Sequence, residues 1–170
     1  GKPYIRSRIV GKLLGFITRM FEWTGALFFN RIVVVIPQIA QNFPARKTLL
    51  VRNLPELKMF RQSVSPDIPK EKNVIIYVGA LTRIRGLKEV VRAMKYVGSR
   101  AQLWLLGKWE SEAFYNECQQ QEGWQYTRYF GQLPQQEAYG YIKAADIGIV
   151  NFLPVPNHLD AMPNKIFEYM

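Results

Sequence analysis

Two arginines set between two glycines are the first residues in this sequence whose types and spacing could do chemistry. The segment GALTRIRGL, residues 79–87, follows an apolar run and precedes a helical pattern, which predicts a loop between a strand and a helix. Free N–H groups at a helix start favour anions, and arginine can bind a diphosphate through two hydrogen bonds. The alternative is a solvated loop with exposed arginines, because the segment matches neither the GxGxxG nor the GxxxxGK pattern. The candidate residues are Gly79, Arg83, Arg85 and Gly86.

A second group of charged residues lies near the carboxyl-terminal end of the sequence. Asp160, Lys165 and Glu168 fall within VPNHLDAMPNKIFEYM, residues 155–170. Lys165 and Glu168 are three positions apart, so they share a face if this segment is a helix. A carboxylate can accept both hydroxyls of a ribose while a lysine binds phosphate. The alternative is an ordinary surface ion pair, which contributes about 0.2–0.5 kcal/mol.

These residues need a scaffold, and the pattern of residues 73–154 predicts one. Apolar runs suited to buried strands alternate with amphipathic helical segments, which is typical of a parallel sheet covered by helices on both faces. Ligands of such sheets bind beyond the carboxyl ends of the strands, where both charged groups fall. We therefore predict an α/β fold with a Rossmann-like sheet. Its strands are expected at 73–81, 101–107, 127–133 and 146–154, and its helices at 86–98, about 110–123, and 135–145.

The first 60 residues differ in charge from the rest of the chain. They hold ten Lys/Arg and two Asp/Glu, a net charge of +8, whereas residues 61–170 carry a net charge of only +2. Apolar residues recur at helical spacing from Ile5 to Leu27, with Arg8, Lys12 and Arg19 along one flank. This pattern is typical of a helix that lies on an anionic membrane surface. It also fits the commoner case of a core helix whose basic side chains reach water.

The region after this helix predicts short strands and then a boundary. RIVVVI at 31–36 favours a buried strand, Pro37 suits the first position of a helix, and 47–53 favours another strand. Prolines, serines and charges then predict a linker at 61–72. We expect a basic end segment of a first domain at 1–60 and a second domain at 73–170.

Several classes of site and partner are excluded by composition. The single cysteine, Cys118, excludes an internal disulfide, and no Cys/His cluster or Asp-x-Asp motif predicts a metal site. The aromatic residues fall at core spacing rather than between Lys and Arg, which argues against a nucleic-acid partner. No uninterrupted apolar run of about 18 residues occurs, so the sequence does not predict a membrane-spanning helix.

Three segments together resemble the group 1 glycosyltransferases (family 4). NVIIYVGALTRIRGLKEVVRAM resembles the strand–loop–helix that opens the donor-binding domain of that family, and FGQLPQQEAYGYIKAADIGIVNFLP resembles its later strand–helix–strand. PNKIFEYM resembles the family's signature segment and is the most specific part. The resemblance covers nearly all of the chain and implies the two-domain GT-B architecture. We expect mainly its C-terminal donor-binding domain, truncated at both ends.

The resemblance also implies roles for the candidate residues. Arg85 would meet the donor diphosphate, as would Arg83, in place of a family arginine whose position is taken here by Ala80. Glu168 would bind the ribose hydroxyls, and Lys165 would lie near it. Asp160 stands where the family has a glutamate that contacts the donor sugar. No catalytic base is identified.

The function that we expect is that of a glycosyltransferase fragment. It would bind a UDP- or GDP-sugar and transfer the sugar, with retention, to a saccharide or lipid-linked acceptor in cell-surface glycan biosynthesis. We expect no tightly bound cofactor and no activity from the isolated chain. The expected location is cytoplasmic, peripheral on the inner face of the plasma membrane if the basic helix binds lipid. Two alternatives stay open, a nucleotide-sugar epimerase of similar fold and a non-catalytic basic membrane-surface module.

Overall fold

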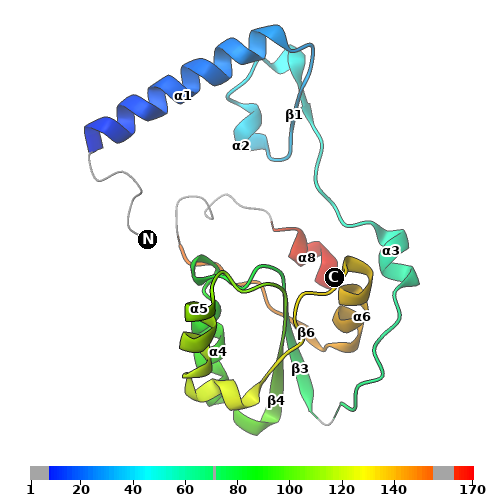
Figure 1. The fold of residues 1–170 in the computed structure, drawn as a ribbon. Helices are drawn as coiled ribbons and strands as arrows, with labels where there is room; N and C mark the ends of the chain where they lie inside the picture. The colour runs from blue at the N-terminus through cyan, green and yellow to red at the C-terminus, as the bar shows by residue number, and fades with distance from the viewer. Residues whose placement is uncertain (1–7, 71, 155–162) are drawn as a thin grey trace. The chain divides into compact units, whose positions relative to one another are not determined.

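The chain consists of two compact units, Gly1–Asn53 and Leu54–Met170. The computed structural model describes residues 8–70, 72–154 and 163–170, and Figure 1 traces the elements of each unit. The assignment of these parts to the domains of a larger protein stays a prediction.

The first unit is built around one long helix and a pair of parallel strands. Lys47 joins them, because its ammonium donates hydrogen bonds to the carbonyls of Ala26 and Leu27 at 3.1 and 2.8 Å. These carbonyls lie at the end of the helix, where intrahelical partners run out. The elements are α1 (Arg8–Phe28), β1 (Ile32–Val34), α2 (Pro37–Ala40), a 3-10 turn (Ala45–Lys47) and β2 (Thr48–Leu50).

The predicted burial of the 31–36 strand is wrong for most of its residues. Val34 is buried, but Val33 is 62% exposed and Val35 is 49% exposed. The physical reason is that β1 has a single neighbouring strand, β2, in the described part of this unit.

The second unit contains the predicted parallel sheet, and the α/β Rossmann-like fold class is confirmed. Its strands lie in the order β5-β4-β3-β6, and all three pairings are parallel. The last strand is shorter than the predicted 146–154 segment, because it pairs with β3 over only two residues. The strands are β3 (Asn73–Val78), β4 (Ala101–Leu106), β5 (Thr127–Tyr129) and β6 (Ile147–Gly148).

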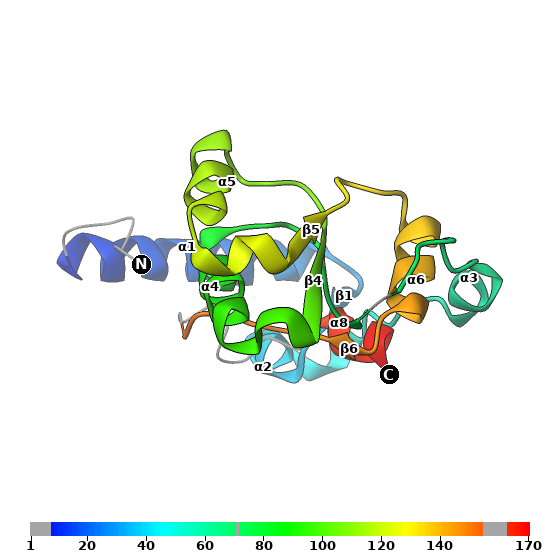
Figure 2. The ribbon, with the colours of Figure 1, turned by 90° about the horizontal axis from the view of Figure 1, so that it is seen from below.

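Helices cover both faces of this sheet, as Figure 2 shows for α4 and α5 on one side and α6 and α3 on the other. Side chains alternate along each strand, so Tyr77 packs under α4 and α5 while Ile76 packs under α6. Phe114 and Tyr139 are the largest buried side chains that the helices contribute to the two layers. The helices are α3 (Leu57–Gln62), α4 (Leu87–Val97), α5 (Glu112–Gln119), α6 (Gln135–Ala144) and α8 (Asn164–Tyr169).

The start of the predicted linker is attached to the second unit. The ring of Phe60 packs edge-on against Tyr139 with 5.3 Å between centroids. Lys143 on α6 donates hydrogen bonds to the carbonyls of Arg61 and Ser63 at 3.1 and 2.7 Å. Residues 57–63 therefore form a packed part of the α6 layer.

Candidate functional site

Two neighbouring strands of the sheet end in glycines that approach each other closely. Gly79 follows β3 with a φ of 131°, and Gly107 follows β4 with a φ of 141°. The N–H of Gly79 donates to the carbonyl of Leu106 at 2.8 Å, which holds the strand ends together. A Cβ on Gly107 would run into the carbonyl oxygen of Gly79, so only glycine fits there.

The glycine after β4 was not among the residues singled out from the sequence. A signal for it exists, because each of the first three strands of this unit ends in two large apolar or aromatic residues and a glycine: YVG, LLG and YFG.

A cavity of about 250 Å³ opens at this edge of the sheet. It lies at the carboxyl ends of β3 and β4, where a parallel sheet is expected to bind its ligand. Its walls combine backbone at the two glycines with apolar side chains and two polar ones. The lining residues are Val78, Gly79, Ala80, Leu106, Gly107, Lys108, Gln132, Leu133 and Ala138.

Two cationic side chains converge on the first of these glycines. Arg85 ends a second 3-10 turn (Arg83–Arg85) that precedes α4, and Lys165 lies in the first turn of α8. A Cβ placed on Gly79 would collide with Lys165 Nζ and would lie 3.3 Å from Arg85 Nη1. Both cationic groups therefore lie over the same piece of backbone. In the parts of the chain that the structure describes, neither forms an ion pair with a carboxylate.

The surroundings of Lys165 disfavour its charge. Burial lowers the pKa of its ammonium below the usual value, the carboxylate of Glu168 opposes this effect, and Arg85 adds to it. Glu168 is half-buried on the same helix, yet no ion pair joins it to Lys165. The ion pair between Lys165 and Glu168, which the sequence analysis gave as the alternative to a ligand site, is therefore not formed.

Arg83 does not join this pair of cations. Its guanidinium Nη2 pairs with Glu117 Oε2 on α5 at 2.6 Å, and its Cζ lies over the ring of Phe114, 4.6 Å from the ring centroid. Its backbone N–H donates to Glu110 Oε2 at 2.8 Å. Contact of Arg83 with a diphosphate stays a prediction.

Gly86 immediately precedes α4 with a left-handed φ of 65°, and Asn151 Nδ2 donates to its carbonyl at 2.9 Å. Within the described part of the chain, no side chain caps the N–H groups that follow Gly86, and such groups at a helix start favour an anion. Asp160, the predicted contact of a donor sugar, lies outside the described residues.

The described residues contain no group of three or more His, Cys, Asp or Glu side chains that could hold a metal ion. Among the described helices, none is long and apolar enough to cross a membrane.

Comparison with known proteins gives one family and a set of distant structures. The family model for "Glycosyl transferases group 1" matches residues 59–170. No match to the chain was found among curated proteins. Similar solved structures include TarM, at 11% identity and a TM-score of 0.48, with 66% of this chain and 23% of that chain covered.

Two further structures have similar scores. The catalytic domain of starch synthase IV from Arabidopsis thaliana, bound to ADP and acarbose, has 15% identity and a TM-score of 0.48, over 74% of this chain and 35% of that chain. A variant of S. aureus TarM in complex with fondaparinux, α-GlcNAc-glycerol and UDP has 10% identity and a TM-score of 0.47, over 64% of this chain and 22% of that chain. The chain thus spans between 22% and 35% of the length of these proteins.

Proposed function

Because the chain belongs to the group 1 glycosyltransferases, we propose that its second unit binds a nucleoside-diphosphate sugar at the carboxyl edge of its sheet. The observation that carries this proposal is the convergence of Arg85 and Lys165 over Gly79. The sugar would pass to a saccharide or lipid-linked acceptor in glycan biosynthesis, with retention of configuration. The family that matches is one of transferases, which favours transfer over epimerisation.

The charge of a diphosphate fits this pair of cations. Two like charges that are held close together and have no ion-paired carboxylate among the described residues repel each other, and a bound dianion would relieve that repulsion. Arginine supplies a planar pair of donors to phosphate oxygens, and lysine supplies a point charge. Both would stabilise the negative charge that develops on the leaving nucleoside diphosphate as the bond between sugar and oxygen breaks.

Other groups at the carboxyl edge of the sheet are suited to bind the remaining parts of the nucleotide-sugar. The first N–H groups of α4, which follow Gly86, face an anion favourably. Glu168 offers two carboxylate oxygens to the ribose hydroxyls. The cavity between Gly79 and Leu133 offers room for the nucleoside, and Asp160 is the proposed contact of the donor sugar.

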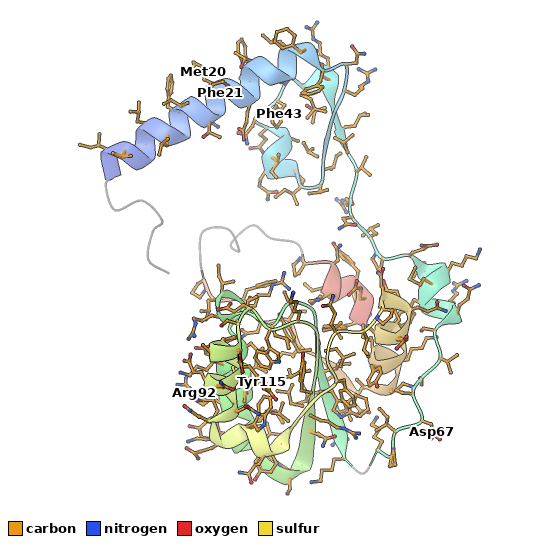
Figure 3. All side chains as sticks on the ribbon, viewed as in Figure 1. Met20, Phe21, Phe43, Asp67, Arg92 and Tyr115 are labelled. Atoms are coloured by element: carbon orange, nitrogen blue, oxygen red, sulfur yellow. The ribbon has the colours of Figure 1, made fainter. Side chains whose placement is uncertain are left out.

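Titration calorimetry with UDP, GDP and their sugars tests the proposal. Wild-type chain is expected to bind one of these nucleotides, and Arg85→Ala and Glu168→Ala are expected to raise its Kd about tenfold or more. Arg92→Ala is the matched control, because it removes an exposed arginine from α4 (Figure 3) and should leave the Kd unchanged. Equal binding by all three variants would show that the site lies elsewhere.

We further propose that α1 lies on an anionic membrane surface, at the cytoplasmic side of the plasma membrane. Figure 3 shows side chains standing out along this helix, with Met20 and Phe21 among them. Met20 is 51% exposed, Phe21 is 69% exposed and Trp23 is 54% exposed. Lys12 and Arg19 lie along one flank of the apolar face, where they can meet anionic headgroups.

Liposome flotation tests this second proposal. The chain is expected to float with vesicles of phosphatidylglycerol and phosphatidylcholine at low salt, and to bind less at high salt or to phosphatidylcholine alone. Arg19→Glu with Lys12→Glu should reduce the bound fraction, whereas Arg92→Glu with Arg100→Glu, exposed residues of the second unit, should not. Binding that is absent, or that salt does not change, would contradict the proposal.

A further inference from the structure

Arg83 is held at both its backbone and its side chain by carboxylates from outside its own loop. Glu110 Oε2 accepts a hydrogen bond from the Arg83 backbone N–H at 2.8 Å, and Glu110 Oε1 lies 3.8 Å from Arg83 Nε. Glu117 Oε2 lies 2.6 Å from Arg83 Nη2. The Cζ of Arg83 lies over the ring of Phe114, 4.6 Å from the ring centroid, where a cation is attracted to the ring face. These contacts hold the guanidinium at α5, although 53% of the side chain is exposed.

The same Glu117 carboxylate also reaches the first turn of α4. Its second oxygen, Oε1, lies 2.6 Å from Lys88 Nζ. One side chain of α5 thereby joins the 3-10 turn Arg83–Arg85 to the helix that follows this turn. Arg83 and then Lys88 lower the pKa of Glu117 to about 2, so the bridge is fully charged at neutral pH.

Backbone hydrogen bonds fasten the loop just before Arg83. The N–H of Leu81 donates to the carbonyl of Lys108 at 2.9 Å, and the N–H of Glu110 donates to the carbonyl of Leu81 at 3.1 Å. Within the 3-10 turn, the N–H of Arg85 donates to the carbonyl of Thr82 at 3.2 Å. The turn is therefore fixed against the loop that carries Glu110.

Arg83 and Arg85 leave this turn in different directions. Successive residues of a 3-10 helix are rotated by about 120°, so residues two apart diverge by the same angle. Arg83 consequently meets Glu117 on α5, while Arg85 reaches over Gly79. The positive charge of Arg83 is balanced locally, whereas in the described residues Arg85 has no carboxylate partner.

We propose that Arg83 is a positioning residue, which orients Arg85 through the bridge to Glu117 and Lys88 and does not itself contact the donor diphosphate. The proposal rests on the function proposed above, since Arg85 is taken to bind that diphosphate. It replaces the direct role that sequence resemblance implies for Arg83.

A double-mutant cycle separates positioning from direct contact. The probe is UDP or GDP, whichever binds the wild-type chain more tightly, and the readout is the Kd from calorimetry. Arg83→Met is expected to raise the Kd about fivefold in the wild-type background and to leave it unchanged in an Arg85→Met background, because its effect passes through Arg85. A residue that contacts the diphosphate would raise the Kd in both backgrounds, and that result would overturn the proposal.

Glu117→Gln gives a second test, because a positioning role and direct contact with the diphosphate predict different changes in the Kd. Loss of the bridge is expected to raise the Kd about as much as Arg83→Met does. If Arg83 were a diphosphate ligand, releasing it from Glu117 would leave the Kd unchanged or lower it. Arg92→Met is the control for removal of a surface cation from α4.

Hydrogen exchange distinguishes failure of this inference from failure of the proposed function. The amides of Arg85 and Gly86 donate hydrogen bonds within the 3-10 turn. Arg83→Met or Glu117→Gln should speed the exchange of these two amides on the order of tenfold and leave the exchange rates in β3 and β4 unchanged. If neither nucleotide binds the wild-type chain, the donor-site proposal fails while exchange still tests the bridge. Unchanged exchange in both variants would overturn the positioning role.

Discussion

The hydroxyl oxygen of Tyr169 accepts a hydrogen bond from the backbone N–H of Val78 at 3.2 Å, which joins the last turn of α8 to the end of β3. The tyrosine ring also lies against Gly148, where a Cβ would collide with it. A helix of six residues has little stability of its own, so these contacts hold it in place. The position of Lys165 over Gly79 depends on them.

Tyr169→Phe should therefore weaken both the fold and nucleotide binding. The variant leaves the Val78 N–H without its partner, which we expect to lower the free energy of unfolding by about 1 kcal/mol. A looser α8 should raise the Kd for UDP or GDP severalfold. Urea unfolding and calorimetry measure the two effects. Tyr96→Phe, at a tyrosine that is 75% exposed, should change neither. An unchanged Kd in Tyr169→Phe would mean that another contact positions Lys165.

The close approach of Gly107 to Gly79 predicts how a substitution at Gly107 changes the stability of the fold. Gly107→Ala should lower the free energy of unfolding by about 3 kcal/mol or more, because it adds a clash with the Gly79 carbonyl to the strain of a positive φ. Gly131→Ala is the matched control, since Gly131 has a φ of 80° but, apart from its chain neighbours, no described residue has an atom within 4 Å of an added Cβ. It should cost only the backbone strain of about 1–2 kcal/mol. Equal losses in the two variants would contradict the close approach.

Much of this arrangement could be predicted from the sequence, for reasons that are visible in particular residues. Apolar runs such as NVIIYV specify buried parallel strands, and the rule that ligands bind at their carboxyl ends directed attention to Arg85 and Lys165. The partner of Arg83 could not be predicted, because Glu117 lies on another helix and only tertiary packing brings the two together. The attachment of α3 depends in the same way on Phe60 meeting Tyr139.

The lowered pKa of Lys165 predicts how nucleotide binding depends on pH. Because burial favours the neutral amine, Lys165 should lose its proton at a lower pH than an ordinary lysine, and the affinity for UDP or GDP should fall as it does so. Lys165→Arg stays charged and should not show this decline. The ratio of the two Kd values, measured by calorimetry from neutral to alkaline pH, cancels the titration of the nucleotide itself. A constant ratio would mean that the charge of Lys165 does not contribute to binding.

The Glu117 bridge predicts a loss of stability in acid. Its pKa is lowered from 4.5 to about 2 by Arg83 and then Lys88, so the folded state releases this proton more readily than the unfolded chain does. The stabilising contribution is therefore complete above pH 4.5 and is lost as the pH falls toward 2. Urea unfolding at about pH 6, 4 and 3 measures the decline, and Glu117→Gln should make it shallower.

Glu112→Gln is the control for this acid dependence, because Glu112 is an exposed glutamate of α5 and forms no ion pair in the described part of the chain. Its decline in acid should match that of the wild type. If Glu117→Gln and Glu112→Gln lose stability in parallel with the wild type, the ion pairs of Glu117 with Arg83 and Lys88 do not persist in solution. The positioning role of Arg83 would then have no physical basis, since it acts through that carboxylate.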